Sequence, residues 1–108
     1  MKVVILKSAQ ADLHQLRQYI LKNFSKDIWL NTYGKLKGSM RNLATYPRLG
    51  AVPPELEGIH GDQFRQLICG MNRIIYELRQ DTVYVHIIVD TRRDLSALLM
   101  RRLFTPGT

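Results

Sequence analysis

Residues 64–89, FRQLICGMNRIIYELRQDTVYVHIIV, decide the fold, because they contain three apolar runs separated by two short polar turns. The runs are rich in β-branched and aromatic residues, which favour strands. They fall at residues 64–68, 73–78 and 83–89. Connections of three or four residues between such runs join antiparallel neighbours. The segment therefore predicts a three-stranded antiparallel meander.

The chain before this segment has the periodicity of helices. Apolar residues recur every three or four positions in two stretches, which is the spacing of one helical face. They are Leu13, Leu16, Ile20 and Phe24 in the first stretch, and Trp29, Tyr33, Leu36, Met40 and Leu43 in the second. We expect a helix over 9–24 capped by Ser8, and a second helix capped by Ser25 that ends before Pro47. The short connection predicts an antiparallel hairpin.

A short strand at residues 2–7 and a short helix at residues 95–104 complete the predicted order, which is β-α-α-β-β-β-α. We expect one α+β domain spanning residues 1–108. It consists of an N-terminal strand, an antiparallel helical hairpin packed on an antiparallel sheet with the three-stranded meander, and a short C-terminal helix.

The composition is strongly basic, with 16 Lys and Arg against 9 Asp and Glu and a net charge of +7. Residues 1–40 hold 7 basic and 2 acidic residues, and residues 41–108 hold 9 and 7. Most of the surplus therefore falls on the predicted hairpin. A charge of this size favours an anionic partner, either nucleic acid or an acidic protein, although a solvated helix face has the same composition.

Several classes of protein are excluded or disfavoured. The one cysteine, Cys69, permits neither an internal disulfide nor a cysteine metal cluster, and we expect no metal and no cofactor. The apolar run after Met1 and Lys2 is four residues long, too short for a signal peptide, and no run is long enough to span a bilayer. These features predict a cytoplasmic protein with no membrane partner.

Three groups of residues, in this order, resemble the RelE/ParE toxin superfamily over nearly the whole chain. The first is Ser8-Ala9-Gln10-Ala11-Asp12-Leu13 with Tyr19-Ile20 one helix later, and the second is the loop Pro47-Arg48-Leu49-Gly50. The third is Phe64-Arg65, then Arg73-Ile74-Ile75-Tyr76, then an isoleucine and valine strand leading to Arg92-Arg93. The chain is most similar to the ParE branch of type II toxin–antitoxin systems.

The resemblance implies a toxin that a cognate antitoxin neutralises by wrapping its tail around it. ParE-like members inhibit DNA gyrase, and RelE-like members cleave mRNA in the ribosome. Promoter DNA is implied as a partner only through the toxin–antitoxin complex. The fold alone does not distinguish the two targets, so the choice depends on the site residues.

A nuclease needs a general base, a general acid and cations for the phosphorane charge. The candidates here are Arg65, Arg73, His86 and Arg92. We expect Arg65 and Arg73 to face one cleft. Strict alternation places His86 away from an aliphatic face made of Val83, Val85, Ile87 and Val89, where an ordinary hydrogen-bonded histidine is favoured over a catalytic one.

Two departures from the RelE pattern favour the gyrase inhibitor. No tyrosine or histidine follows Arg92-Arg93 within the next residues, and Glu55 and Glu57 replace the lysines that RelE-like nucleases carry in the preceding loop. The alternatives are a ribosome-dependent mRNA endonuclease and, from another class, a non-toxic basic nucleic-acid-binding module. The last lacks a recognition-helix signature.

We therefore expect two binding surfaces. The target-binding candidates are Arg65, Arg73, Arg92, Arg93, Arg101 and Arg102. For the first four of these arginines, a structural role in pairing with carboxylates such as Asp90 or Asp94 stays open. The antitoxin-binding candidates lie on the helices, in an apolar groove between the hairpin and the sheet edge. They are Leu13, Leu16, Ile20, Trp29 and Tyr33.

Overall fold

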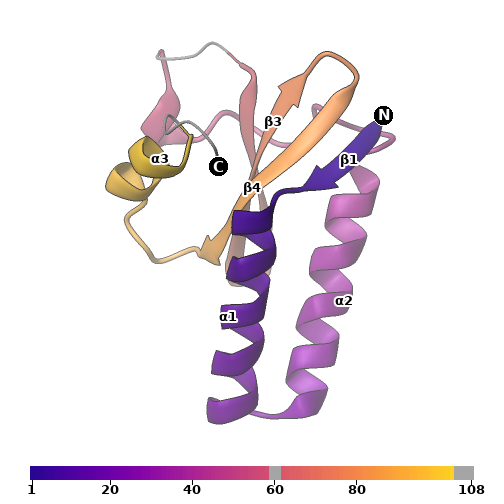
Figure 1. The fold of residues 1–108 in the computed structure, drawn as a ribbon, viewed down its shortest axis with the longest axis vertical. Coiled ribbons are helices and arrows are strands. Elements are labelled where there is room, and N and C mark those ends of the chain that lie inside the picture. The colour runs from indigo at the N-terminus through magenta and orange to yellow at the C-terminus, as the bar shows by residue number, and fades with distance from the viewer. Residues whose placement is uncertain (59–61, 104–108) are drawn as a thin grey trace.

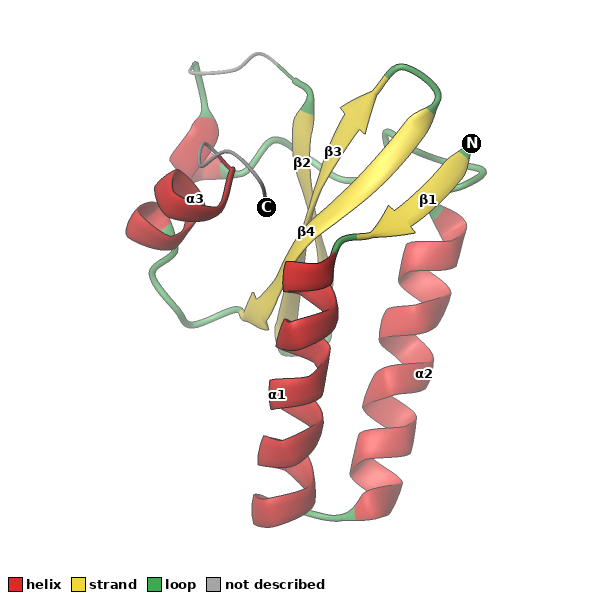
Figure 2. Ribbon diagram, in the orientation of Figure 1, coloured by secondary structure: helices red, strands yellow, loops and turns green. Residues whose placement is uncertain are grey.

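The computed structural model describes residues 1–58 and 62–103, and its element order is the predicted β-α-α-β-β-β-α. The elements are β1 (Lys2–Ile5), α1 (Lys7–Asn23), α2 (Lys26–Asn42), a 3-10 turn η1 (Pro54–Leu56), β2 (Phe64–Cys69), β3 (Asn72–Arg79), β4 (Thr82–Asp90) and α3 (Ser96–Leu103). Helices α1 and α2 form an antiparallel hairpin whose closed end projects beyond the sheet (Figures 1 and 2). Within the described ranges, no helix has the length and apolar character needed to cross a membrane.

The sheet has the strand order β1-β4-β3-β2. Strands β2, β3 and β4 form the predicted antiparallel meander. Strand β1 pairs with β4 in parallel, so the sheet is mixed rather than antiparallel throughout. The parallel pairing follows from the connection, because the chain crosses from one sheet edge to the other through the hairpin and then returns through the meander.

Both faces of the sheet are covered. The hairpin covers one face through a core that includes Leu36, Met40 and Tyr76. Helix α3 and η1 cover the other face through a second core that includes Phe64, Leu95 and Leu99. Two buried faces explain why the strands have near-continuous apolar runs instead of clean alternation.

One prediction about β4 is wrong because of a β-bulge. The register between β3 and β4 shifts so that Ile75 pairs with Ile87 while Tyr76 pairs with Val85, which leaves His86 as the extra residue. The alternation reverses there: Val83 and Val85 lie in the hairpin-side core, but Ile87 lies in the core under α3. The four aliphatic residues of β4 therefore do not share one face, since a bulge exchanges the faces of the residues that follow it.

The predicted helix caps had different outcomes. Ser25 caps α2, since its hydroxyl accepts a hydrogen bond from the Ile28 backbone N–H at 3.2 Å. Ser8 does not cap α1, which begins at Lys7 after Leu6. Its hydroxyl instead donates to the backbone carbonyl of His86 at 3.3 Å. The first helix therefore starts earlier than predicted and uses its serine to hold β4.

Candidate functional site: a groove along helix α1

A long groove lies between helix α1 and the C-terminal end of β4. Its middle part is a hollow of about 460 Å³ lined by Leu16 and Tyr19 of α1, by Asn72 of β3, and by Ile88, Val89, Asp90, Arg92 and Arg93. Adjoining hollows extend it in both directions along α1 and share Leu16, Asp90, Val89 or Arg93 with the middle part. We refer to this continuous feature as the α1 groove.

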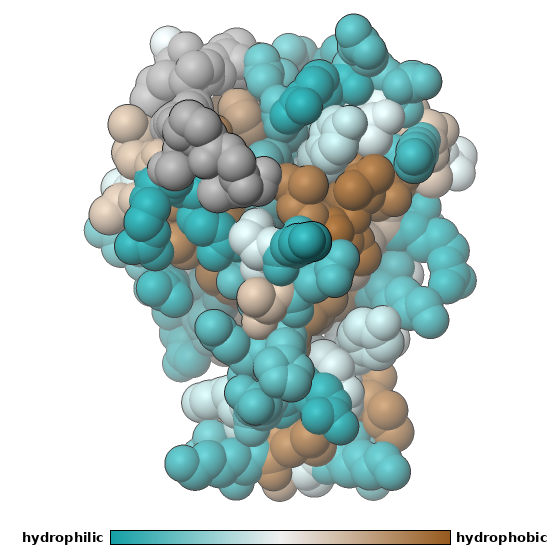
Figure 3. All heavy atoms as spheres, viewed as in Figure 1, coloured by the Kyte–Doolittle hydropathy of each residue, from teal (hydrophilic) through white to brown (hydrophobic). Residues whose placement is uncertain are grey.

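The end of the α1 groove near the tip of the hairpin is apolar. Its walls include Tyr19, Ile20, Phe24 and Ile28 of the hairpin and Met71 of the β2–β3 turn, and its charged residues, Asp90 and Arg92, are paired with each other. Tyr19, Phe24, Ile28 and Met71 are exposed by 45 to 60%. Figure 3 shows hydrophobic side chains at the projecting end of the hairpin. Large exposed apolar side chains gathered around a hollow are typical of a protein-binding surface.

The opposite end of the α1 groove is cationic. It is lined by Arg93, Arg101 and Arg102, and by Asp12 of α1. Arg102 donates to both carboxylate oxygens of Asp12, at 3.3 and 2.9 Å, and to the His86 carbonyl at 2.8 Å. These bonds fix α3 against α1 and β4. Arg93 and Arg101 extend into solvent.

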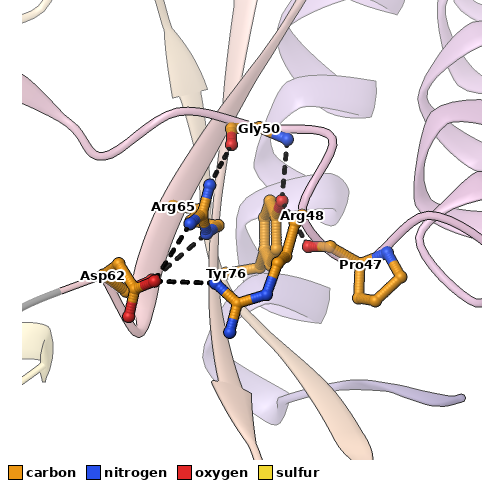
Figure 4. Close-up of polar contacts among 6 residues, drawn as sticks. All are labelled: Pro47, Arg48, Gly50, Asp62, Arg65 and Tyr76. Carbon is orange, nitrogen blue, oxygen red and sulfur yellow. Dashed lines mark hydrogen bonds and ion pairs between the residues drawn. The ribbon is translucent and has the colours of Figure 1, made fainter.

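The structure separates Arg65 from Arg73, which the sequence predicted to face one cleft. Arg65 lies opposite Tyr76 in the sheet, on the hairpin side, and donates to the Gly50 carbonyl at 2.7 Å and to Asp62 (Figure 4). Arg73 lies on the other face. It is buried and donates to Gln66 and to both carboxylate oxygens of Glu55. Both arginines therefore hold loops to the sheet.

The contacts around Arg65 attach the loop after α2 to strand β2. The Tyr76 hydroxyl accepts from the Gly50 N–H at 2.9 Å and donates to the Pro47 carbonyl at 2.8 Å (Figure 4). Burial raises the pKa of Tyr76 above its ordinary value, so the hydroxyl keeps its proton for this bond. The family-like motif Pro47–Gly50 thus has a structural explanation.

His86 is buried, with 6% of its surface exposed, and its Nε2 lies 2.9 Å from Glu77 Oε1. Burial lowers the pKa of His86, although Glu77 opposes the shift. Burial acts to raise the pKa of Glu77, but hydrogen bonds from Arg79 and His86 outweigh it and leave that pKa below its ordinary value. The pair is therefore a neutral imidazole donating to a carboxylate, inside the fold and away from the groove.

Of the remaining predicted site residues, some line the α1 groove and others do not. Arg92 is exposed and pairs with Asp90 at 2.9 Å, as the sequence suggested for an arginine at a strand end. Of the antitoxin candidates, Leu16 and Ile20 line the α1 groove, and Leu13 packs against the hairpin-side core. Trp29 is buried and stacks on Tyr33 at 5.2 Å, and neither lines the groove.

Sequence reasoning missed Tyr19, Phe24, Ile28 and Met71 as groove residues. Tyr19 and Ile28 are each adjacent in sequence to a residue of the apolar stripes that predicted the helices, Ile20 and Trp29. That adjacency was the only signal in the sequence that could have indicated them. In the described part of the chain, no three His, Cys, Asp or Glu side chains come together in a way that could hold a metal ion.

Comparison with known proteins finds one matching family and similar solved structures. The model of the ParE toxin of the type II toxin–antitoxin system parDE matches residues 3–95. A chromosomal ParDE toxin–antitoxin system from P. aeruginosa contains a structurally similar chain, with a TM-score of 0.69 and 14% identity over 83% of this chain and 95% of that one. No curated protein matches the sequence.

A second similar structure is a copper-bound mutant toxin from Helicobacter pylori. Its TM-score is 0.52 and its identity is 17%, over 84% of this chain and 94% of that one. At these identities the two structural matches support the fold alone. The family assignment comes from the sequence match over residues 3–95.

Proposed function

Because the chain belongs to the ParE toxin family of type II toxin–antitoxin systems, we propose that it arrests growth by binding DNA gyrase and that a cognate antitoxin neutralises it. The proposal is for an inhibitor that acts by contact, in the cytoplasm, without a catalytic step of its own. Its link to promoter DNA is through the toxin–antitoxin complex.

The observation that favours an inhibitor over a nuclease is the burial of two candidate catalytic residues, Arg73 and His86. Arg73 and His86 are 7% and 6% exposed, and both are bonded within the fold. Arg65 lies on the opposite face of the sheet from Arg73 and is bonded to the loop at Gly50. A ribonuclease must bring its acid, base and cations within reach of one phosphate. These candidates do not converge on an accessible point.

The exposed residues favour binding instead. Arg93 and Arg101 are the accessible cations at one end of the α1 groove, and apolar side chains form the other end. Arg92 is accessible as well but is paired with Asp90. Apolar anchors bordered by arginines are typical of protein-binding surfaces, in which arginine and aromatic residues contribute most of the affinity. We assign the arginines to gyrase and the apolar end to the antitoxin.

Two assays test this function. Expression of the chain alone is expected to stop bacterial growth and produce filaments, and co-expression of a small acidic antitoxin from the adjoining reading frame is expected to restore growth. The purified chain is expected to inhibit supercoiling of relaxed plasmid by gyrase. Ribosome-dependent mRNA cleavage with normal supercoiling would instead support the nuclease alternative. Normal growth at high expression would refute toxicity.

A further inference from the structure

The cationic end of the α1 groove has a charge that the described residues do not neutralise. Three arginines and one carboxylate, Asp12, line it. Asp12 is already used: it accepts from Arg102 through both oxygens and from the Ile88 backbone N–H at 3.0 Å. Within the described residues, Arg93 and Arg101 have no side-chain hydrogen bond or ion pair. Two guanidinium groups therefore line this end with no anionic partner among residues 1–58 and 62–103.

Hydrogen bonds and core packing set the position of these two arginines. Arg93 follows the turn after β4, where its backbone N–H donates to the Asp90 carbonyl at 3.2 Å. Arg101 lies on α3, whose Leu98 and Leu99 are buried in the core. The neighbouring Arg102 fixes this helix to α1 and β4. Guanidinium groups held on ordered backbone lose less freedom on binding an anion.

We propose that Arg93 and Arg101 form a carboxylate-binding site for an acidic segment of the antitoxin, whose apolar side chains occupy the other end of the α1 groove. The inference rests on the proposed toxin–antitoxin function and adds the orientation of the antitoxin segment in the groove. The segment lies along α1 with its apolar part between Tyr19, Phe24 and Met71 and its Asp or Glu residues beside α3. Guanidinium groups bind carboxylates with paired, charge-assisted hydrogen bonds.

The chemistry of the groove favours an acidic peptide over nucleic acid. A phosphate backbone needs a row of cations along its whole path. Here the two cations that have no partner among the described residues, Arg93 and Arg101, meet at one end, and the far end is mainly apolar. Arg92, which lines both the middle part and the far end, is paired there with Asp90. A peptide with separate apolar and acidic parts matches that order. The lysines of the hairpin that would suit a nucleic acid, such as Lys22 and Lys26, do not line the groove.

The arrangement also gives a mechanism for neutralisation. Arg93 and Arg101 are among the cations that we assign to target binding. A carboxylate segment seated on them removes their charge and covers them. The antitoxin then blocks the target surface directly, with no change in the fold of the toxin.

The test uses a fluorescent helical peptide with a leucine stripe followed by a run of glutamates, and a second peptide with glutamines in place of the glutamates. Binding of each to the whole chain is measured by anisotropy. The variant is Arg93→Ala with Arg101→Ala, and the matched control is Lys22→Ala with Lys26→Ala, which removes the same charge outside the groove. We expect the arginine variant to bind the glutamate peptide about tenfold more weakly, and the lysine variant to bind it nearly as well as the parent.

The glutamine peptide is expected to bind the parent weakly and to be insensitive to the arginine variant. Equal losses in the two variants would overturn the proposal, because they would show attraction to net charge alone. A short DNA duplex that binds more tightly than the glutamate peptide, and loses affinity with the arginine variant, would assign the site to phosphate and overturn it as well. Peptide binding and gyrase inhibition are measured in separate assays. The carboxylate-binding site and the proposed inhibition of gyrase can therefore be refuted independently.

Discussion

Arg73 and Glu55 form a two-point ion pair, with both terminal guanidinium nitrogens 2.9 Å from the two carboxylate oxygens. Arg73 is 7% exposed, and the Arg73 guanidinium is the main cause of a lowered pKa for Glu55. The pair joins β3 to η1, the turn that covers the second core. Removal of Glu55 would leave a buried guanidinium without compensation, and removal of Arg73 would leave a carboxylate whose side chain is 19% exposed.

We predict that Arg73→Met lowers the free energy of unfolding by about 1–3 kcal/mol, because it leaves the partly buried Glu55 carboxylate without its cation. The double variant Arg73→Met with Glu55→Met is expected to recover a large part of that loss, because no unpaired charge remains. Urea denaturation measures both. We also expect the double variant to inhibit supercoiling as the parent does. A double variant that is stable but inactive would show that Arg73 contacts the target.

The loop held by Tyr76 gives a second prediction. Tyr76→Phe removes the acceptor for the buried Gly50 N–H and the donor for the half-buried Pro47 carbonyl. We expect a loss of about 1–3 kcal/mol in the free energy of unfolding, since a buried donor is left unsatisfied. Thermal or urea unfolding measures it, and a change within error would mean that water replaces the hydroxyl.

Gly50→Ala should be more damaging than a typical glycine replacement. An added Cβ would lie 2.4 Å from the Gln66 carbonyl oxygen, a backbone atom that also accepts from the Ala51 N–H. The control is Gly38→Ala in α2, where an added Cβ meets nothing within 4 Å. That substitution should stabilise the chain by about 0.5–1 kcal/mol through helix propensity. In urea denaturation we expect Gly50→Ala to lower the free energy of unfolding and Gly38→Ala to raise it. Equal changes in the two variants would contradict the close approach at Gly50.

The helices and strands were predictable because the signals that form them are local. Periodic apolar residues gave both helices of the hairpin, and Ser25 with Asp27 in the first turn gave the start of α2. The parallel pairing of β1 and the bulge at His86 were not predictable. Each depends on contacts between segments far apart in the chain, such as the pairing of Val3 with Val83.

The site was harder to predict for the same reason. The contact of Arg92 with Asp90 was accessible to sequence reasoning because the two residues are neighbours in the chain. The partners of Arg73 and Arg102 lie 18 and 90 residues away, so no spacing rule distinguishes these two structural arginines from Arg93 and Arg101. Only the folded chain shows which arginines are already paired.

The apolar end of the α1 groove leads to a prediction about the antitoxin. Tyr19→Asp with Phe24→Asp places two charges where we expect apolar contacts, and the two rings now lie 6.1 Å apart. We expect at least a tenfold loss of antitoxin affinity, by roughly 1–3 kcal/mol for each anchor. Leu21→Asp with Leu30→Asp is the control, because these exposed leucines do not line the groove. Titration calorimetry measures the affinity of each folded double variant for the antitoxin. Equal losses of affinity in the two variants would mean that the antitoxin binds outside the α1 groove.

The buried pair of His86 and Glu77 makes stability depend on pH. Burial lowers the pKa of His86, and the positive charges of Arg79 and Arg102 lower it further, while Glu77 acts in the opposite direction. The unfolded chain has an ordinary histidine with a pKa of about 6.5. As the pH falls below that value, the unfolded chain binds a proton that the native chain does not. The free energy of unfolding therefore decreases, by at most about 1.4 kcal/mol per pH unit for this one group.

His86→Gln tests this dependence, because glutamine still donates to Glu77 but does not titrate. We expect the variant to lose most of the decrease in stability between about pH 7 and pH 5, measured by urea denaturation at each pH. His14→Gln, a change at an exposed histidine, is the matched control. Glu77, whose pKa is also lowered, adds a second decrease only below about pH 4.5. An unchanged slope in His86→Gln would mean that the buried imidazole accepts its proton as readily as an exposed one, with Glu77 fully offsetting the cost of burial.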